Sequence, residues 1–253
     1  MFSSEHGITG TGYAHQTMTF NPFPPSINIA HTGHATLHYS RYSETHLFPM
    51  FNLSITGFLT GKLYPELNGT YHVISSGGFT SELTFSGKAL WKGKKNTFEA
   101  KLYKTEDRRK RALYSIKGQW SGRFTIYDET VTPKREIETW DSATSLTSKA
   151  TFPEKENSWE TRVAWRDTLD AIRRGDVAGI VTAKSKVENW QRAMRRHEKE
   201  KGQGWRPQYF SSVGQSEIFR ELVGTLNNSA WGLEAERTKG VWVFNGGAGD
   251  DLD

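Results

Sequence analysis

Residues 79–87 read FTSELTFSG, a stretch in which apolar and polar side chains alternate. Because successive side chains of a β-strand point to opposite faces, Phe79, Leu83 and Phe85 fall on one face of an extended chain. Two glycines at positions 77–78 precede the stretch, and glycine is a common turn residue. The pattern therefore predicts a half-buried strand that follows a tight turn.

The same alternation recurs in three later segments, TFEAKLY at 97–103, RALYSIK at 111–117 and QWSGRFTIY at 119–127. In the last of these, Trp120, Phe124 and Ile126 share one face, although alternation does not say whether that face is the inner or the outer one. Turn residues separate the segments, and no helical period interrupts residues 27–140. We therefore expect an antiparallel meander that curls into a large, incomplete β-barrel, because a flat sheet of this size would expose long edges.

The period of the sequence changes near residue 150. Ser158 can cap a helix in which Trp165, Leu169 and Ile172 recur at helical spacing, and Gly175 is placed to end it. A second helix is expected over the stretch that begins KSKVENWQRAMRR at residue 184.

Two short elements are expected near the end of the chain, a helix around residues 217–226 and a strand at GVWVFN, residues 240–245. An acidic, glycine-rich tail follows and is expected to fray. The fold class predicted is α+β and predominantly β, a large antiparallel (incomplete) β-barrel followed by C-terminal helices. Residues 1–150 are assigned to the barrel, and residues 151–253 to a C-terminal helical subdomain with a short final strand and a disordered acidic tail.

The composition limits the chemistry that the chain can perform. It has 253 residues and no cysteine, which excludes disulfides, thiolate metal sites and cysteine nucleophiles and suits a reducing compartment. The N-terminus lacks the features of a secretory signal, and no apolar run reaches the ~18–20 residues that a spanning helix needs. We therefore expect a cytoplasmic protein whose membrane contact is peripheral.

Positive charge is concentrated in two parts of the chain. Residues 92–117 carry ten basic and three acidic residues, and residues 184–206 carry eight basic and three acidic residues. Such clusters favour partners that bear phosphate, such as nucleic acid, an anionic bilayer or a phosphorylated headgroup.

The helix expected from residue 184 onward has a narrow apolar arc, made of Ala183, Val187, Trp190 and Met194, which we expect to be buried. Beside this arc, three charged residues stand at i, i+4 and i+8: Lys184, Glu188 and Arg192. One interpretation is a solvated salt-bridge ladder, which contributes little to stability. The other is a cradle for a dianionic phosphate, in which the carboxylate holds the lysine and the arginine in place. The pattern alone leaves both open.

The three histidines at positions 31, 34 and 38 raise the question of a metal site. On a strand, His34 and His38 share one face and His31 lies on the other, so the three do not converge on one ion. We interpret them as partly exposed strand histidines.

Lys94 and Lys95 lie in a predicted hairpin turn, where they are either simply solvated or in contact with an anionic bilayer. Basic residues interleaved with aromatics at 101–120 are also a feature of nucleic-acid-binding proteins, but no recognition motif accompanies them. The sequence has no nucleophile elbow, no H-E-x-x-H and no Walker motif. We therefore predict no catalytic residues, no metal site and no cofactor.

Several ordered segments resemble the ligand-binding domain of oxysterol-binding proteins, the sterol and phosphoinositide exchangers, and the fungal members most closely. These segments are GHATLHYSRYSETH, ITGFLTGKLYPELNGTYHVISSGGFTSELTFSGK, WKGKKNTFEAKLY, LYSIKGQWSGRFTI, SWETRVAWRDTLDAIRRGD, KSKVENWQRAMRR and GVWVFN. The resemblance implies a large antiparallel barrel that encloses a lipid, with C-terminal helices beside its mouth. Because His34 lies inside one of these segments, the resemblance also implies a structural role for it.

In that family, a lysine, a glutamate and an arginine at i, i+4 and i+8 help to bind the headgroup of phosphatidylinositol 4-phosphate. Carried across residue by residue, these are Lys184, Glu188 and Arg192. The resemblance implies a lipid-transfer protein that is not an enzyme. It would exchange sterol or another apolar lipid for phosphatidylinositol 4-phosphate, act as a monomer that binds no nucleic acid, and associate peripherally with the anionic surfaces of organelle membranes.

One part of the family pattern is absent from this sequence. The signature of glutamate, glutamine, valine and serine followed by two histidines and two prolines does not occur, and Pro24 and Pro25 have no histidines before them. The family's lid and upstream phosphate-binding lysine are missing as well, so the resemblance covers about two-thirds of that domain. A barrel without its first strands has an open edge and an exposed apolar interior. The alternative expectation is therefore a truncated module that contacts membranes or proteins without extracting lipid.

Overall fold

The computed structural model describes residues 2–3, 6–87, 94–107, 111–142, 160–202, 204, 207, 210–226 and 241–244. The chain forms two compact units, a sheet unit of residues 1–145 and 209–253 and a helical unit of residues 146–208. The predicted C-terminal subdomain, 151–253, is thus divided between the two units. Its functional separation from residues 1–150 stays a prediction, and the acidic tail lies outside the described residues.

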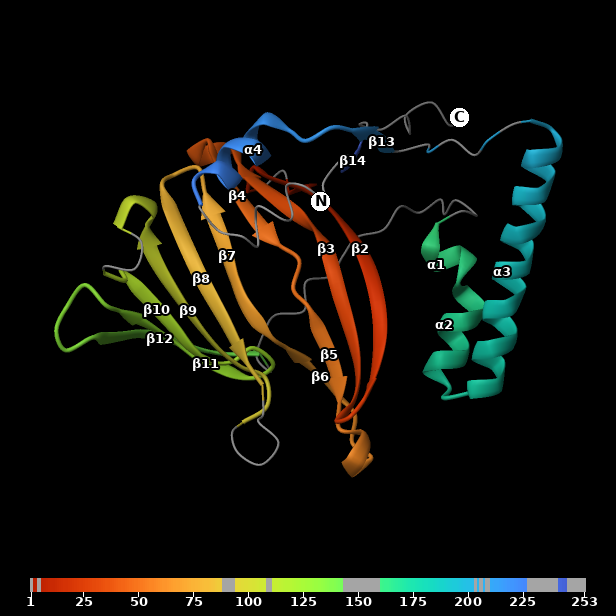
Figure 1. Ribbon diagram of the computed structural model, residues 1–253, viewed down its shortest axis with the longest axis horizontal. Coiled ribbons are helices and arrows are strands. Elements are labelled where there is room, and N and C mark those ends of the chain that lie inside the picture. Colours follow the sequence, from red (N-terminus) through yellow and green to blue (C-terminus); the bar gives the residue numbers. More distant parts are fainter. Residues whose placement is uncertain are drawn as a thin grey trace. The chain divides into compact units, whose positions relative to one another are not determined.

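The sheet unit contains a twelve-stranded sheet among its described residues. The strands follow the order β1-β2-β3-β4-β7-β8-β9-β10-β11-β12, and β5 pairs with β3 and β6 (Figure 1). Their bounds are Phe2–Ser3 (β1), Ile8–Pro22 (β2), Pro25–Tyr39 (β3), Glu44–Pro49 (β4), Leu53–Thr56 (β5), Tyr64–Leu67 (β6), Gly69–Ser75 (β7), Phe79–Ser86 (β8), Thr97–Lys104 (β9), Tyr114–Gln119 (β10), Arg123–Asp128 (β11) and Arg135–Asp141 (β12). Single turns of 3-10 helix, η1 (Ser40–Tyr42), η2 (Phe58–Thr60) and η3 (Thr105–Asp107), connect some of them.

The predicted antiparallel sheet, incomplete as a barrel, is confirmed. Every strand pair in it is antiparallel, and in the described part of the chain the path ends at β12 without returning to β1. Positive φ angles mark the turns, at Gly78 between β7 and β8 and at Asn96 just before β9. The turn residues in the sequence therefore lie where the strands reverse.

One long strand was not predicted. β2 pairs with β3 over fifteen residues, from Ile8 opposite Tyr39 to Pro22 opposite Pro25. The sequence prediction starts the strands at Ile27 and so misses β2. Most of its side chains are exposed threonine, glycine and polar residues near one end of the sheet, so no apolar alternation marks it.

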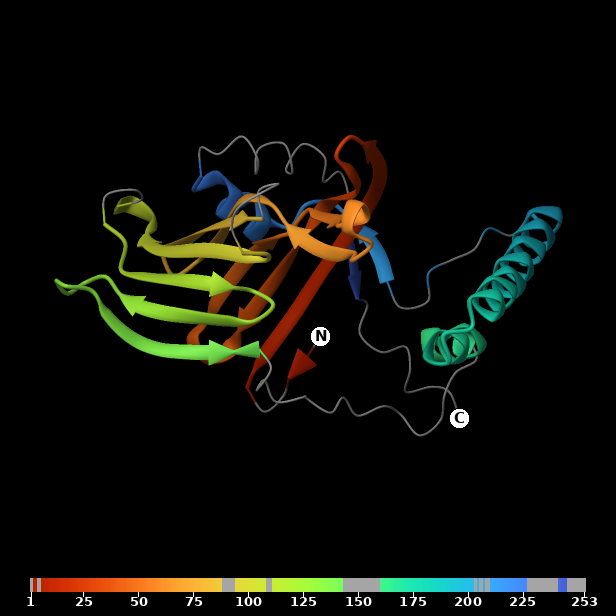
Figure 2. The same ribbon diagram turned by 90° about the horizontal axis from the view of Figure 1, so that it is seen from below.

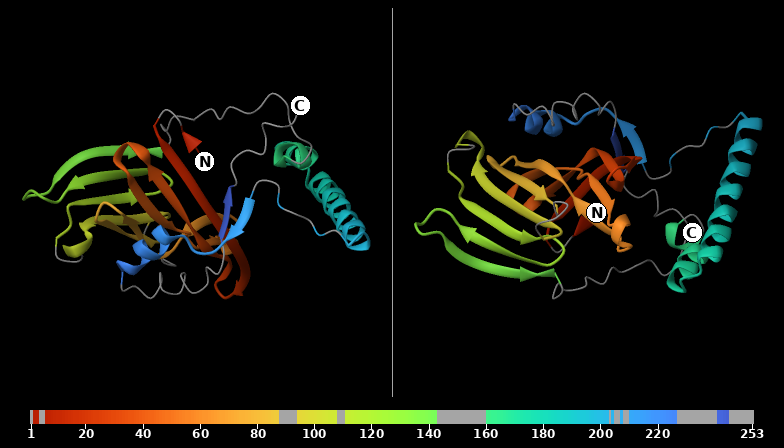
Figure 3. Two further views of the ribbon diagram at one scale, coloured as in Figure 1. Left: turned by 90° about the horizontal axis from the view of Figure 1, so that it is seen from above. Right: turned by 60° about the horizontal axis from the view of Figure 1, so that its bottom comes forward.

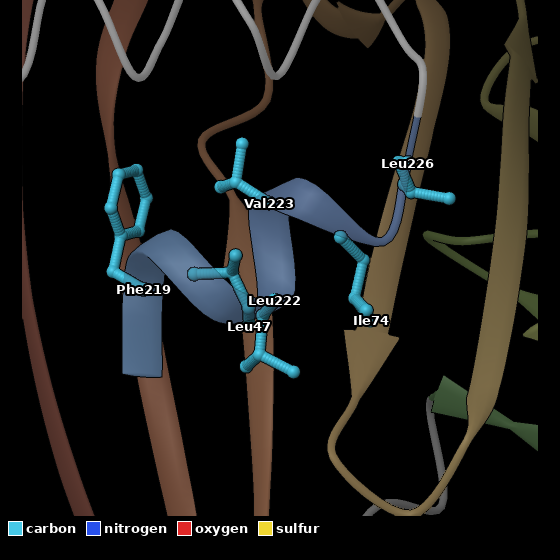
Figure 4. Close-up of a cluster of buried hydrophobic side chains, with 6 residues drawn as sticks. All are labelled: Leu47, Ile74, Phe219, Leu222, Val223 and Leu226. Carbon is cyan, nitrogen blue, oxygen red and sulfur yellow. The ribbon is translucent and has the colours of Figure 1, made fainter. Parts of the chain in front are cut away.

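The helix α4 (Glu217–Gly224) covers part of one face of the sheet and confirms the predicted short helix. The hydroxyl of Ser216 caps it by accepting a hydrogen bond from the Phe219 amide. The apolar side chains of α4 and the strands below form a closed core, which contains Leu47, Ile74, Phe219, Leu222, Val223 and Leu226 (Figure 4). Because Leu47 lies on β4 and Ile74 on β7, α4 fastens onto neighbouring strands.

A second, two-stranded sheet in the same unit pairs β13 (Phe210–Val213) with β14 (Val241–Phe244). The final strand was predicted from GVWVFN. Its partner β13 was not, because the sequence after residue 205 shows no regular period.

The helical unit contains α1 (Thr161–Ala164), α2 (Arg166–Arg173) and α3 (Val177–Glu200), and Figure 2 shows α2 and α3 side by side. Gly175, at a φ of 67°, ends α2 as predicted, whereas the predicted cap Ser158 lies outside the described residues. The carboxylate of Asp176 caps α3 by accepting a hydrogen bond of 2.8 Å from the Gly179 amide. None of the described helices combines the length and the apolarity needed to cross a membrane.

The apolar arc of α3 is less buried than predicted. Ala183, Val187 and Met194 are half-buried, and Trp190 keeps 46% of its surface exposed. Because α2 has eight residues and α3 has twenty-four, α2 can cover only part of the arc within the helical unit.

Candidate functional site

The face of the large sheet opposite α4 carries a row of aromatic rings, and we call it the aromatic face. Phe85 on β8 lies opposite Phe98 on β9, and their ring centroids are 6.1 Å apart. Phe98 is 5.8 Å from Phe124 on β11, in an edge-to-face arrangement. Phe51 and Tyr71 extend the row at the other end, with centroids 5.0 Å apart. These separations lie within the 4.5–7 Å range typical of favourable aromatic pairs.

A glycine makes the contact between Phe98 and Phe124 possible. Gly118 on β10 lies opposite both residues, which are two strands apart and would otherwise be separated by roughly 10 Å. Its φ is +155°, and a Cβ placed there would stand 2.4 Å from the carbonyl oxygen of Arg123 and 2.7 Å from the Phe124 Cβ. The sheet is therefore closely packed at Gly118, and the two rings meet above the missing side chain.

A second row on the same face is aliphatic. Leu83, Ala100, Ile116 and Ile126 lie opposite one another on β8, β9, β10 and β11. From β8 to β11 neither row contains a charged side chain, and on β12 the aliphatic row ends at Glu138, which lies opposite Ile126. Among the described residues, α4 is the longest helix of the sheet unit, and it packs on the opposite face. The two rows thus form an apolar patch on β8 to β11 that α4 does not cover, and such a patch suits an apolar ligand. Within it Phe85 and Ala100 are already buried, at 8% and 7% exposed, and the other members are half-buried. Of the residues whose direction the sequence left open, Phe85 and Phe124 are on this face, while Trp120 lies in the turn between β10 and β11.

The three predicted headgroup residues lie together on α3. The Lys184 Nζ is 2.8 Å from Glu188 Oε1, and the Arg192 Nη2 is 3.7 Å from Glu188 Oε2. The hydrogen bond from Lys184, its charge and the charge of Arg192 hold the pKa of Glu188 below its usual value. Both cations are more than half exposed, at 56% and 63%. One carboxylate therefore holds two accessible cations on one side of the helix, an arrangement that fits either interpretation of the ladder.

Other cations on α3 differ from those of the ladder. Lys186 is 79% exposed and lies 3.6 Å from Asp167 of α2, and the Arg195 Nε donates to the carbonyl of Gln191 in a long contact of 3.4 Å. In the described interactions, neither Lys186 nor Arg195 is paired with a carboxylate that also binds a second cation, as Glu188 does. Lys186 is therefore a useful control for the ladder.

The histidines follow the sequence prediction in part. His34 and His38 share a face, and among the described residues no group of three or more possible ligands could hold a metal ion. His34, however, was predicted to be partly exposed and is 7% exposed, because Phe219 of α4 stacks on its ring at 4.0 Å. Burial lowers the pKa of His34 to about 4, so the ring is neutral near pH 7. This supports a structural role for His34.

Lys95 and Asn96 of the 94–96 turn have local partners. The Lys95 ammonium lies 3.5 Å from the centre of the Tyr64 ring, and the Glu66 carboxylate accepts a hydrogen bond of 2.7 Å from the Asn96 amide. Glu66 is 7% exposed and fixes the turn against β6. Sequence reasoning missed this role, and the signal that could have found it is a glutamate among the apolar residues of a strand, which is unusual.

Comparison with known proteins identifies relatives over almost the whole chain. The family model described as Oxysterol-binding protein matches residues 4–248. The chain is 37% identical over 250 residues to the Probable transporter efuK of Hormonema carpetanum, covering 97% of this chain and 35% of that protein. It is 27% identical over 247 residues to the Protein kes1 of Schizosaccharomyces pombe, covering 96% of this chain and 61% of that protein.

Solved structures share the fold. The Osh1 ORD domain in complex with ergosterol matches with a TM-score of 0.63 and 14% identity, covering 95% of this chain and 59% of that chain. The Osh3 ORD of Saccharomyces cerevisiae in complex with PI(4)P matches with a TM-score of 0.59 and 17% identity, covering 82% of this chain and 56% of that chain. This chain therefore spans between about a third and three-fifths of the length of these relatives. The match of the family model over residues 4–248 shows that the chain belongs to the oxysterol-binding protein family.

Proposed function

We propose that this chain binds and transfers lipid without catalysing a reaction. In this proposal, sterol or another apolar lipid lies against the aromatic face, and phosphatidylinositol 4-phosphate competes with it. The observation that carries the proposal is the pair of apolar rows on one face of the sheet, aromatic from Phe85 to Phe124 and aliphatic from Leu83 to Ile126. The related ORD structures, which hold ergosterol and PI(4)P, support the choice of ligands.

Burial of an apolar ligand would supply most of the affinity for sterol. Transfer of apolar area out of water contributes about 25 cal/mol per Å², and flat rings pack well on aromatic side chains. Because the two rows contain no charged side chain from β8 to β11, a ligand on these strands would not desolvate an unpaired ion.

The ladder on α3 would supply the headgroup contacts. Lys184 offers a compact charge and Arg192 a planar fork of donors, and both suit a phosphate dianion. Glu188 would keep both side chains extended in the absence of ligand, which reduces the entropy lost on binding. Lys184, Glu188 and Arg192 are therefore the proposed headgroup-binding residues.

The test for sterol uses vesicles that contain a fluorescent sterol. We expect the purified chain to withdraw this sterol, and Phe124→Asp to abolish withdrawal because it puts a charge in the aromatic row. Thr125→Asp is the matched control, since Thr125 is the next residue on β11, points to the opposite face and pairs with Thr139. Equal withdrawal by both variants would place the sterol elsewhere.

The test for the headgroup uses vesicles that contain phosphatidylinositol 4-phosphate. We expect the double variant Lys184→Ala/Arg192→Ala to extract this lipid at least tenfold less well, because each removes a charge-assisted hydrogen bond. The control Lys186→Ala/Arg196→Ala removes the same charge from the same helix and should extract normally, because both residues are exposed on α3 and neither pairs with Glu188 in the described interactions. If the parent chain extracts neither lipid, the transfer proposal is wrong for this chain.

A second candidate function is a module that adsorbs to membranes without extracting lipid. The observation in its favour is the strand path, which among described residues does not close from β12 to β1. Trp140 on β12 is 49% exposed at this edge. This candidate predicts adsorption to anionic vesicles that weakens with added salt, with no sterol or phosphoinositide in the soluble fraction.

A further inference from the structure

The end of the sheet unit where β2 turns into β3 exposes large apolar side chains. Phe23, in the turn, is 89% exposed, and Leu59, in η2, is 78% exposed. Leu63, just after η2, is 57% exposed. Figure 3 shows the β2–β3 turn and η2 near each other in the sheet unit. We call Phe23, Phe58, Leu59 and Leu63 the apolar tip.

A pocket joins the two loops of the apolar tip. It has a volume of about 480 Å³ and is lined by Pro24 and Pro25 of the turn and by Phe58 and Leu59 of η2. Phe58 and Leu59 thus line the pocket, and Phe23 and Leu63 are the sequence neighbours of the lining residues Pro24 and Lys62. Scattered single apolar residues are normal on a protein surface, whereas several exposed apolar side chains grouped together are typical of an interaction site.

The charge around this pocket is positive. Lys62 and Lys95 line it, and neither has an ion pair in the part of the chain that the structure describes. The acid that also lines the pocket, Glu66, is 7% exposed and accepts a hydrogen bond from the Asn96 amide. An approaching surface therefore meets two exposed lysines and little accessible negative charge, and the ammonium group of Lys95 lies over the ring of Tyr64.

We propose that the apolar tip docks on an anionic lipid bilayer. Phe23 and Leu59 would enter the boundary between headgroups and acyl chains, while Lys62 and Lys95 would contact lipid phosphates. A protein partner fits this surface less well, because lysine is depleted in the cores of protein interfaces. The inference is independent of lipid transfer, since adsorption at this tip needs neither lipid uptake nor the ladder on α3. It rests on the second candidate function, adsorption to membranes, and names the surface that makes the contact; vesicle binding that the tip variants leave unchanged would refute the tip and not adsorption itself.

The sequence offers a direct test because the chain has no cysteine. A single cysteine placed by Phe23→Cys or Leu59→Cys can carry an environment-sensitive nitrobenzoxadiazole dye. Tyr42→Cys is the matched control, because Tyr42 is 67% exposed and follows the far end of β3. A strand of fifteen residues separates the two ends by roughly 45–50 Å.

Vesicles of phosphatidylcholine with phosphatidylserine, and without sterol or phosphoinositide, are added to each labelled chain. We expect the emission of the dye at positions 23 and 59 to rise and shift to the blue, and the emission at position 42 to stay unchanged. An equal response at position 42, or no response at 23 and 59, overturns the proposal. Because these vesicles hold no transferable ligand, the result is independent of whether the chain extracts lipid.

Sedimentation with the same vesicles supplies the second measurement. Phe23→Ser/Leu59→Ser and Lys62→Gln/Lys95→Gln should each weaken vesicle binding by about tenfold or more, because each removes two contacts with the bilayer. Tyr42→Ser should bind like the parent chain. Circular dichroism checks that each variant folds. Unchanged sedimentation of both double variants would contradict the proposal. So would variants that bind vesicles normally but no longer self-associate, because the apolar tip would then contact a second copy of the chain and not the bilayer.

Discussion

The two faces of the large sheet are built differently. On one face α4 closes over Leu47 and Ile74, which are fully buried, and the uncovered remainder is polar and carries ion pairs such as Lys117 with Glu99 at 3.1 Å. The aromatic face has neither a covering helix nor such pairs in its two described rows. The α4 face thus supplies folding stability from a closed core, whereas the aromatic face offers apolar surface for a ligand. Substitutions on the two faces should therefore change different measured quantities.

The largest effect is expected at the centre of the α4 face. Phe219→Ala removes a ring that is 0% exposed and stacks on His34. The free energy of unfolding should fall by about 3–5 kcal/mol, measured by chemical denaturation. Phe23→Ala is the control, and because Phe23 is 89% exposed it should change stability by less than about 0.5 kcal/mol. Equal effects would show that α4 does not hold the core.

The next effect is a dependence of stability on pH through His34. Its pKa is about 4 in the folded chain, against the ordinary value of 6.5 that applies to an unfolded chain, so between these values the unfolded chain binds more protons. The contribution of neutral His34 to the free energy of unfolding is therefore fully present above about pH 6.5. It is lost as the pH falls towards 4, and the total loss is about 3 kcal/mol. Denaturation at several pH values should show this slope in the parent chain.

The pH prediction has a matched control on the same strand. His34→Phe should remove the part of the slope between about pH 5 and 6.5, because a phenyl ring can stack on Phe219 but cannot bind a proton. Carboxylates with a lowered pKa, such as Glu99, give a slope at lower pH that should remain. His38→Phe should leave the slope in place, because His38 is exposed. A slope between about pH 5 and 6.5 that survives His34→Phe would assign the effect to other groups.

A smaller loss of stability is expected on the aromatic face from Gly118→Ala. The new Cβ would meet the backbone of β11 at 2.4 Å and would require a φ of +155°, so the free energy of unfolding should fall by roughly 2–3 kcal/mol. Gly78→Ala isolates the strain of a positive φ, since it stands at +82° with nothing within 4 Å, and should cost about 1 kcal/mol. Denaturation of both variants gives the comparison. If the two substitutions lower the free energy of unfolding equally, close packing at Gly118 does not contribute to stability.

The smallest effect is expected for the exposed ion pairs of the α4 face. Although burial raises the pKa of Glu99, the hydrogen bond from Lys117 and the charge of Lys101 outweigh burial and hold this pKa below its usual value. Lys117→Ala should nevertheless lower the free energy of unfolding by at most about 0.5 kcal/mol, because Lys117 is 50% exposed. A loss above about 1 kcal/mol in the same denaturation measurement would mean that ion pairs, as well as the core, stabilise this face.

The features that the sequence predicted well are local ones. The ladder of Lys184, Glu188 and Arg192 follows from helical spacing alone, and the end of α2 follows from Gly175. Alternation also placed Phe79, Leu83 and Phe85 on one face. Each of these depends on residues close in sequence, whose geometry a helix or a strand fixes by itself.

The features that the sequence did not predict depend on distant partners. Burial of His34 comes from Phe219, which lies in a helix far along the chain. The contact between Phe98 and Phe124 depends on the register of β9, β10 and β11 around Gly118. β2 carries no apolar alternation because most of its side chains are exposed. Alternation names the residues of a face, but only pairing between strands shows what that face meets.

The division of the chain into two units has a consequence for synthesis on the ribosome. The sheet unit is interrupted by the helical unit, residues 146–208, and resumes only afterwards with β13 and α4. Leu47 and Ile74 emerge long before Phe219 and Leu222, the side chains that bury them. A nascent chain that has reached only α3 therefore still shows the apolar patch that α4 will cover. The core of the sheet unit is therefore completed only after the whole helical unit has been synthesised.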